Sequence, residues 1–228
     1  MTVHHPDTSH EAVRLRHELI DSAYLAGGTE LLRLGARPVS DLIDISGLVS
    51  DEIVEKDGFV LIGARTTLES LLSCELAPGF IREAAGFCFS FEKRNAATVG
   101  GNLSLHRTDS YLASAFAAAE AEVILECTSG EKRKPIAEYL SKRCRGLVRY
   151  FAVDKDRTGR VWRFGRTASS HAALIAAESN GTYAVSSSGS PLAIGSSPDL
   201  YKSIGFVSDL EGSAEYKRYL ASIVFEEA

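Results

Sequence analysis

Leu25-Ala26-Gly27-Gly28-Thr29-Glu30-Leu31-Leu32 is a short apolar run that ends in two glycines and is then followed by a helix-like pattern. The residues before the glycines predict a β-strand, and Thr29 is a good N-cap for a helix that also carries Leu34. Glycines let a ligand approach the backbone, and unpaired N–H groups at a helix start attract anions. The stretch predicts a phosphate-binding turn, with an ordinary tight turn as the alternative.

A second stretch, Thr98-Val99-Gly100-Gly101-Asn102, places hydroxyl and amide side chains beside another glycine pair. We expect bare N–H groups here too, and two such loops suit a diphosphate better than a single phosphate. Neither stretch matches G-x-G-x-x-G or G-x-x-x-x-G-K-[ST], so neither a Rossmann nor a Walker site is predicted. The spacing alone does not distinguish a flavin from other diphosphate ligands.

Helix-like and strand-like patterns alternate around both stretches. The other helices of this part are expected at residues 10–21, 66–74, 78–89 and 109–119. The strands are expected at residues 23–25, 42–45, 59–64 and 122–126. Strands that alternate with helices predict an α/β domain over residues 1–142, made of two subdomains that divide near residue 58.

The last third of the sequence, residues 143–228, has a different pattern. Strands are expected at residues 147–153, 160–164, 172–177 and 182–186. Asn180-Gly181 is a strong signal for a hairpin between the last two. Helices are expected at residues 198–204 and 213–225, whereas the serine-rich segment 186–190 is expected to be a flexible loop. The pattern predicts a small α+β domain, and an α+β class for the whole chain.

Composition excludes several classes of protein. The chain has 228 residues, with 45% hydrophobic and 24% charged residues, as is usual for a folded globular protein. The net charge of −5 and the absence of aromatic residues among the basic runs argue against a nucleic-acid partner. No apolar run is long enough to span a bilayer, and the polar start lacks a secretory signal, so a cytoplasmic location is expected.

Cysteine and histidine spacing gives no sign of a metal site. The four cysteines include no C-x-x-C pair, so this chain is not expected to carry a zinc ribbon or its own iron–sulfur cluster. The histidines at positions 4, 5 and 10 are expected to lie near a mobile terminus. His106 and His171 stand alone, without H-x-x-x-H spacing, and no metal ligand is assigned.

Several motifs, taken in order, resemble the flavoprotein subunits of molybdenum hydroxylases. This family comprises the FAD-carrying chains or domains of relatives of xanthine dehydrogenase and carbon monoxide dehydrogenase. Beside the two glycine stretches, the motifs are Leu42-Ile43-Asp44-Ile45, residues 62–67, Arg94-Asn95, and Gly212-Ser213-Ala214-Glu215-Tyr216-Lys217-Arg218. The resemblance implies an FAD domain of the vanillyl-alcohol-oxidase (PCMH) type, followed by a smaller C-terminal α+β domain.

The resemblance also implies a set of FAD ligands. Residues 25–32 and 98–102 would grip the pyrophosphate, and Leu147 or Val148 would contact the flavin. Arg166 is assigned as the basic residue near the following strand. Most relatives have an acidic residue nine positions after the loop asparagine; that position is Tyr111 here, so Asp109 is assigned instead. No catalytic residue is expected, because FAD carries the electron chemistry.

The function that the resemblance implies is electron transfer. Electrons would pass from a molybdopterin subunit through an iron–sulfur subunit to FAD, and then to NAD+ or another acceptor. Two alternatives remain open at this point. One is a family-fold protein that binds flavin weakly or not at all and serves assembly, and the other is a stand-alone flavin-dependent reductase.

Overall fold

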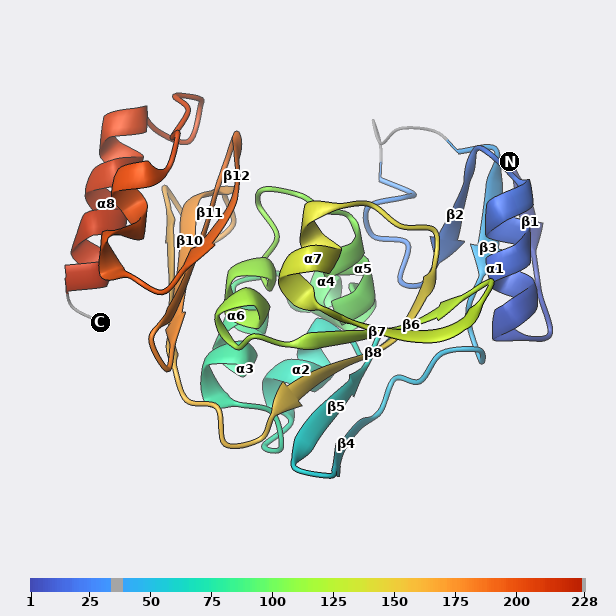
Figure 1. Cartoon of the computed structure of the whole chain (residues 1–228). Helices are drawn as coiled ribbons and strands as arrows, with labels where there is room; N and C mark the ends of the chain where they lie inside the picture. Colours follow the sequence, from blue (N-terminus) through green and yellow to red (C-terminus); the bar gives the residue numbers. More distant parts are fainter. Residues whose placement is uncertain (34–38, 227–228) are drawn as a thin grey trace.

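The computed structural model describes residues 1–33 and 39–226, and its first unit is a parallel sheet of three strands with the order β1-β3-β2 (Figure 1). Helix α1 (Ser9–Glu18) connects the first two strands, and the Thr8 side chain caps it by accepting from the Glu11 N–H. The strands are β1 (Thr2–His4), β2 (Ser22–Leu25) and β3 (Asp41–Asp44). The chain start is therefore an edge strand rather than a mobile terminus.

The second unit is an antiparallel sheet of five strands, with the order β4-β5-β8-β6-β7. Its strands are β4 (Ile53–Lys56), β5 (Phe59–Gly63), β6 (Glu122–Cys127), β7 (Gly130–Pro135) and β8 (Leu147–Asp154). Its helices are α2 (Leu68–Ser73), α3 (Gly79–Gly86), α4 (Phe91–Ala96), α5 (Val99–Ser104), α6 (Ala113–Ala118) and α7 (Ile136–Ser141). These helices fill the middle of the molecule, between this sheet and the C-terminal one (Figure 1).

The third unit is an antiparallel sheet of four strands, with the order β12-β11-β10-β9. Asn180 (φ 48°) and Gly181 (φ 81°) form the two-residue turn of the predicted hairpin, which is confirmed. The strands are β9 (Arg160–Gly165), β10 (Ala172–Ser179), β11 (Thr182–Ser187) and β12 (Ser190–Gly195). Helix α6 packs on one face, and the 3-10 helix η1 (Pro198–Ser203) and α8 (Ala214–Glu226) lie on the other side (Figure 1).

Three sequence-based expectations are corrected by the structure. The helix expected at 109–119 begins only at Ala113, because side-chain bonds hold residues 109–112 in a loop. The helix expected after the first glycine stretch is a turn over residues 29–32, and Leu34 lies outside the described residues. The serine-rich segment is not a flexible loop, since it forms the ends and the turn of the β11–β12 hairpin.

Strand pairing bears on where the second domain begins. β8 lies after the predicted boundary near residue 143, yet it pairs with β5 and β6 in the second unit. The chain passes to the four-stranded sheet only between Asp154 and Arg160. The division into 1–142 and 143–228 stays a prediction, and the pairing favours a boundary after β8.

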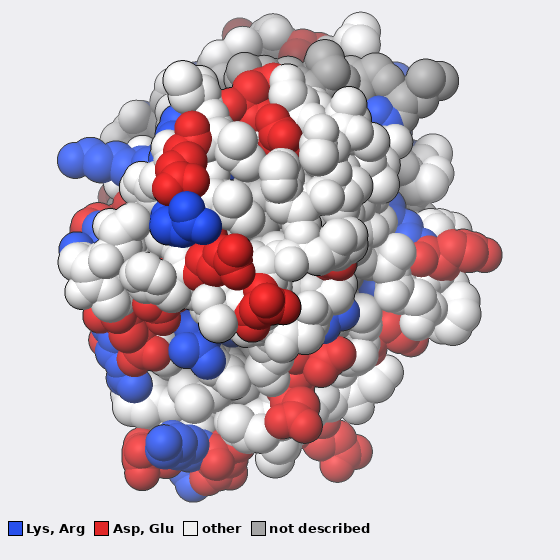
Figure 2. All heavy atoms as spheres, turned by 90° about the vertical axis from the view of Figure 1, so that its right-hand side faces the viewer, with Lys and Arg blue, Asp and Glu red and all other residues white. Residues whose placement is uncertain are grey.

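Over the first unit, Figure 2 shows acidic and basic side chains interspersed rather than a continuous basic surface of the type that binds nucleic acid. Within residues 1–33 and 39–226, no helix has the length and apolar character needed to cross a bilayer.

A fully buried lysine fixes α8 to the third unit. The Lys217 ammonium lies 2.7 Å from the Asp209 carboxylate and donates to the backbone oxygens of Ser188 and Val207. Burial by itself raises the pKa of Asp209, but hydrogen bonds from Lys217 and Ser188 outweigh it and lower the pKa to about 2. The lysine is thus satisfied on several sides, as a buried charge requires.

We expect Lys217→Met to lower the free energy of unfolding by about 3 kcal/mol, because it breaks a buried ion pair. The folded-state pKa of Asp209 lies below its ordinary value of 3.8, so its contribution is complete above that value. It is lost as the pH falls through about 2, and the difference between wild type and variant should shrink over this window. Denaturant unfolding at several pH values measures this. Lys202→Met, at an exposed pair with Asp199, is the control and should change little; equal losses in the two variants would contradict the role of Lys217.

Candidate functional site

A cavity lies between the first unit and the second. Its volume of about 640 Å³ is in the range of ligand-binding sites. Most of the predicted site residues line it. From the two glycine stretches these are Ala26, Gly27, Gly28, Thr29, Glu30, Leu31, Thr98, Gly100, Gly101 and Asn102, and from later segments they are Asp109, Leu147 and Val148. Four predicted residues do not line it: Leu25, Leu32, Val99 and Arg166.

The first glycine stretch forms an open turn after β2. Gly28 has φ +66°, and its carbonyl accepts a single helical-type hydrogen bond, from the Leu32 N–H at 2.9 Å. Within the described part of the chain, the N–H groups of residues 27–31 make no hydrogen bond. Since no helix follows within the described residues, attraction for an anion comes from these loop N–H groups rather than from a helix dipole.

The second glycine stretch is the capped first turn of α5, and its N–H groups are not bare. The Val99 and Gly100 N–H groups donate to the backbone oxygens of Thr66 and Ala64. The Gly101 N–H donates to the Thr98 hydroxyl at 3.0 Å, and the Asn102 N–H donates to the Thr98 carbonyl. The expectation of bare N–H groups at the glycine pair is wrong, because capping and docking of the helix use the four N–H groups from Val99 to Asn102.

Asn102 holds the wall of the cavity in place. Its Oδ1 accepts from the Ser110 hydroxyl at 2.7 Å and from the Leu112 N–H at 3.2 Å. The Ser110 hydroxyl in turn accepts from the Ala113 N–H, at the start of α6. The segment that carries Asp109 and Tyr111 is therefore held by one half-buried amide side chain.

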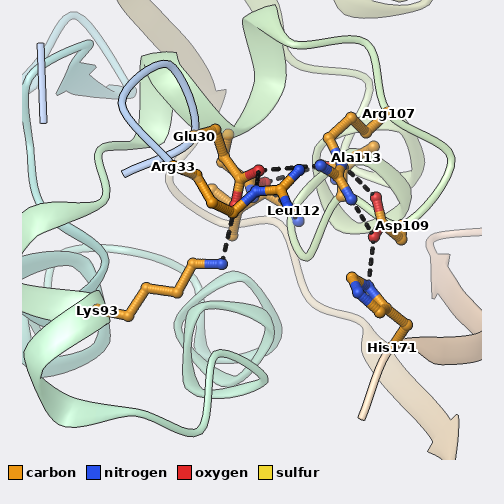
Figure 3. Close-up of polar contacts among 10 residues, drawn as sticks. Glu30, Arg33, Lys93, Arg107, Asp109, Leu112, Ala113 and His171 are labelled. Atoms are coloured by element: carbon orange, nitrogen blue, oxygen red, sulfur yellow. Dashed lines mark hydrogen bonds and ion pairs between the residues drawn. The ribbon is translucent and has the colours of Figure 1, made fainter. Parts of the chain in front are cut away.

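Charged side chains form a continuous network along one side of the cavity (Figure 3). The Glu30 carboxylate accepts from Lys93 Nζ at 3.0 Å, Arg107 Nη1 at 2.9 Å and Arg33 Nε at 3.1 Å. On the other side of Arg107, Asp109 accepts two hydrogen bonds from its guanidinium, both 2.7 Å long. Asp109 Oδ2 also lies 2.7 Å from His171 Nδ1.

The network keeps both carboxylates ionised. Burial by itself raises the pKa of Glu30, but the hydrogen bond from Lys93 and the nearby cations outweigh it, so the pKa lies below its ordinary value. Burial also opposes ionisation of Asp109, and the hydrogen bonds and charges of Arg107 and His171 lower its pKa in the same way. The hydrogen bond to Asp109 raises the pKa of Arg107, which remains a cation.

Aromatic and aliphatic residues supply the remaining walls. Leu147 and Val148 are buried at the start of β8. Tyr24 donates to the Arg145 carbonyl at 2.9 Å, and Tyr111 lies under Lys93, whose Nζ is 5.9 Å from the ring centre. This combination of apolar walls and a polar loop suits a ligand with a ring system and a diphosphate.

Arg166 lies apart from this cavity. Its side chain is 67% exposed and pairs with Glu211 at 3.7 Å. Its assignment as an FAD ligand stays a prediction, as do those of the other site residues. Sequence reasoning did not select Lys93, Arg107 and His171, which only the tertiary structure brings together; the one local signal was the basic Lys93-Arg94 pair shortly before the second glycine stretch.

A family model described as "FAD binding domain in molybdopterin dehydrogenase" matches residues 1–149, and the chain belongs to this family. The uncharacterized protein YgfM of Escherichia coli K12 is 30% identical over 165 residues. That similarity covers 71% of this chain and 62% of YgfM, so the chain spans less than two thirds of this relative.

Solved structures share the fold over the whole chain. The match to a reconstituted CO dehydrogenase from Oligotropha carboxidovorans has a TM-score of 0.85 and 20% sequence identity, and it covers 96% of that chain. Quinoline 2-oxidoreductase from Pseudomonas putida 86 has a TM-score of 0.81 at 16% identity and is covered to 94%. Each match covers 100% of this chain, and the expected α+β fold is confirmed.

The site fits the cofactor of this family. The N–H groups of residues 27–31 are unpaired within the described part of the chain, and Lys93 and Arg107 lie beside the same cavity. Such donors and cations match a diphosphate, and the buried Leu147 and Val148 offer an apolar wall. The residues present are therefore suited to FAD.

We expect Asn102→Ala to loosen the segment from Ser110 to Ala113. The change leaves the buried Leu112 N–H without its acceptor, which lowers local stability by about 1–3 kcal/mol. Amide hydrogen exchange at Leu112 and Ala113 should accelerate accordingly. Asn95→Ala removes an exposed hydrogen bond within α4 and is the control. Unchanged exchange at both amides in the Asn102 variant would show that the side chain does not hold this wall.

Proposed function

We propose that this chain is the FAD-binding electron-transfer subunit of a molybdenum hydroxylase-type oxidoreductase. The observation that carries the proposal is the cavity in which the turn over residues 27–31, two cations and an apolar wall come together, in a chain of the FAD-binding family. The loop N–H groups and Lys93 would hold the diphosphate. Leu147 and Val148 would contact the ring system and exclude water from it.

FAD when bound supplies transfer of one or two electrons, and the protein supplies binding and orientation. The sequence contains no C-x-x-C pair that could ligate a cluster, so electrons would have to arrive from another chain. We infer an iron–sulfur subunit and a molybdopterin subunit as partners, with NAD+ or another acceptor receiving the electrons. A Cu,Mo-CO dehydrogenase shares this fold, which supports a molybdenum-containing assembly.

We expect Gly28→Val to weaken FAD binding at least about tenfold. Gly28 has φ +66°, and a β-branched residue there strains the backbone by roughly 1–3 kcal/mol, which should reorient the N–H groups of the turn. Titration of the purified protein with FAD, followed by flavin fluorescence, measures the affinity. Gly47→Val is the matched control, because Gly47 also has a positive φ (80°) but lies outside the cavity.

Three results separate the proposal from its alternatives. Protein that purifies yellow, or that takes up added FAD, supports the proposal. Wild-type protein that is colourless and does not bind added FAD would overturn the proposal and favour an assembly role. Oxidation of NADH or NADPH by the isolated, FAD-loaded chain without partners would instead favour a stand-alone reductase.

A further inference from the structure

Glu30 places a carboxylate inside the turn that offers N–H groups to an anion. Its side chain is only 17% exposed and contacts three cations: Arg33, Lys93 and Arg107. These cations come from three separate segments, which are the turn itself, α4 and the loop before α6 (Figure 3). A carboxylate that gathers cations from so many places occupies the position where an anionic ligand would find its counter-charges.

The charges of the cluster formed by Glu30, Arg33, Lys93, Arg107 and Asp109 show how Glu30 would compete with an anionic ligand. Three cations face two carboxylates, Glu30 and Asp109, so this cluster by itself leaves one net positive charge to neutralise a diphosphate. Asp109 is engaged on the far side of Arg107 and contacts His171. Of the two carboxylates, Glu30 is the one that also contacts Lys93 and Arg33. Ion pairs in such a partly buried site are screened less by solvent than exposed pairs are.

We propose that the Glu30 carboxylate occupies the place of the diphosphate in the ligand-free chain. It pairs there with Lys93 and Arg107, and it leaves them when FAD binds. The inference rests on the proposed function and adds a residue that sets affinity. Its consequence is that binding is an exchange of one anion for another, so the wild-type chain holds FAD less tightly than the same cavity without this carboxylate. Arg107 stays in position during the exchange, because Asp109 holds it through two hydrogen bonds.

The test is the substitution Glu30→Gln, which keeps the size of the side chain and removes its charge. Affinity for FAD and for ADP, which carries the diphosphate without the flavin, is measured by isothermal titration. We expect both ligands to bind roughly tenfold more tightly to the variant, equivalent to about 1.4 kcal/mol. Glu55→Gln is the control, because Glu55 pairs with Lys155 away from the cavity and should leave both affinities unchanged.

A second measurement uses wild-type protein and so does not depend on folding of the variant. The pKa of Glu30, followed by carboxylate NMR, should rise when FAD is added, because the carboxylate loses its cations and faces a diphosphate. Equal or weaker binding by the variant, or a Glu30 pKa that FAD leaves unchanged, would overturn the inference. If the wild-type chain binds neither FAD nor ADP, the proposed function is overturned instead.

Discussion

Close packing of two glycines against neighbouring backbone brings the candidate site together. A Cβ atom on Gly27 would lie 1.7 Å from the Ala96 carbonyl oxygen, and one on Gly100 would lie 2.7 Å from the Ala64 carbonyl oxygen. Ala96 ends α4, and Ala64 follows β5. The turn of the first unit therefore rests on the second unit, and α5 rests on the end of its sheet. Any side chain at these positions would separate the surfaces that enclose the cavity.

The charged network adds a second set of connections on top of this packing. Glu30 links the first turn to α4 and to the loop before α6, and Asp109 links that loop to His171, which immediately precedes β10. These ion pairs are partly buried, so solvent screens them less than surface pairs. The same side chains that could neutralise a diphosphate thus also connect all three units. Through these few side chains, binding of a diphosphate would be coupled to the relative order of these segments.

The sequence predicted most of the buried apolar strands, but it missed β12 and the edge strands β4 and β7. β5, β6 and β10 are buried runs of aliphatic residues, and each was predicted near its observed bounds. β4 and β7 are edge strands that carry several charged residues and pair through their backbone, so their sequences give little strand signal. The glycines of the site were found from local pattern. The cations of the site were not, since no spacing in the sequence brings Lys93 next to Arg107.

The two glycine stretches have the same local pattern but different roles, and counting hydrogen bonds separates them. Every N–H from Val99 to Asn102 has an acceptor within the protein, so the second stretch mainly builds the start of α5. The turn at residues 27–31 has no such acceptors within the described residues. Unpaired backbone donors are unfavourable when they are withdrawn from water, unless a ligand accepts from them. The first stretch therefore keeps backbone donors that a ligand could use, whereas the second uses its donors to build and dock the start of α5.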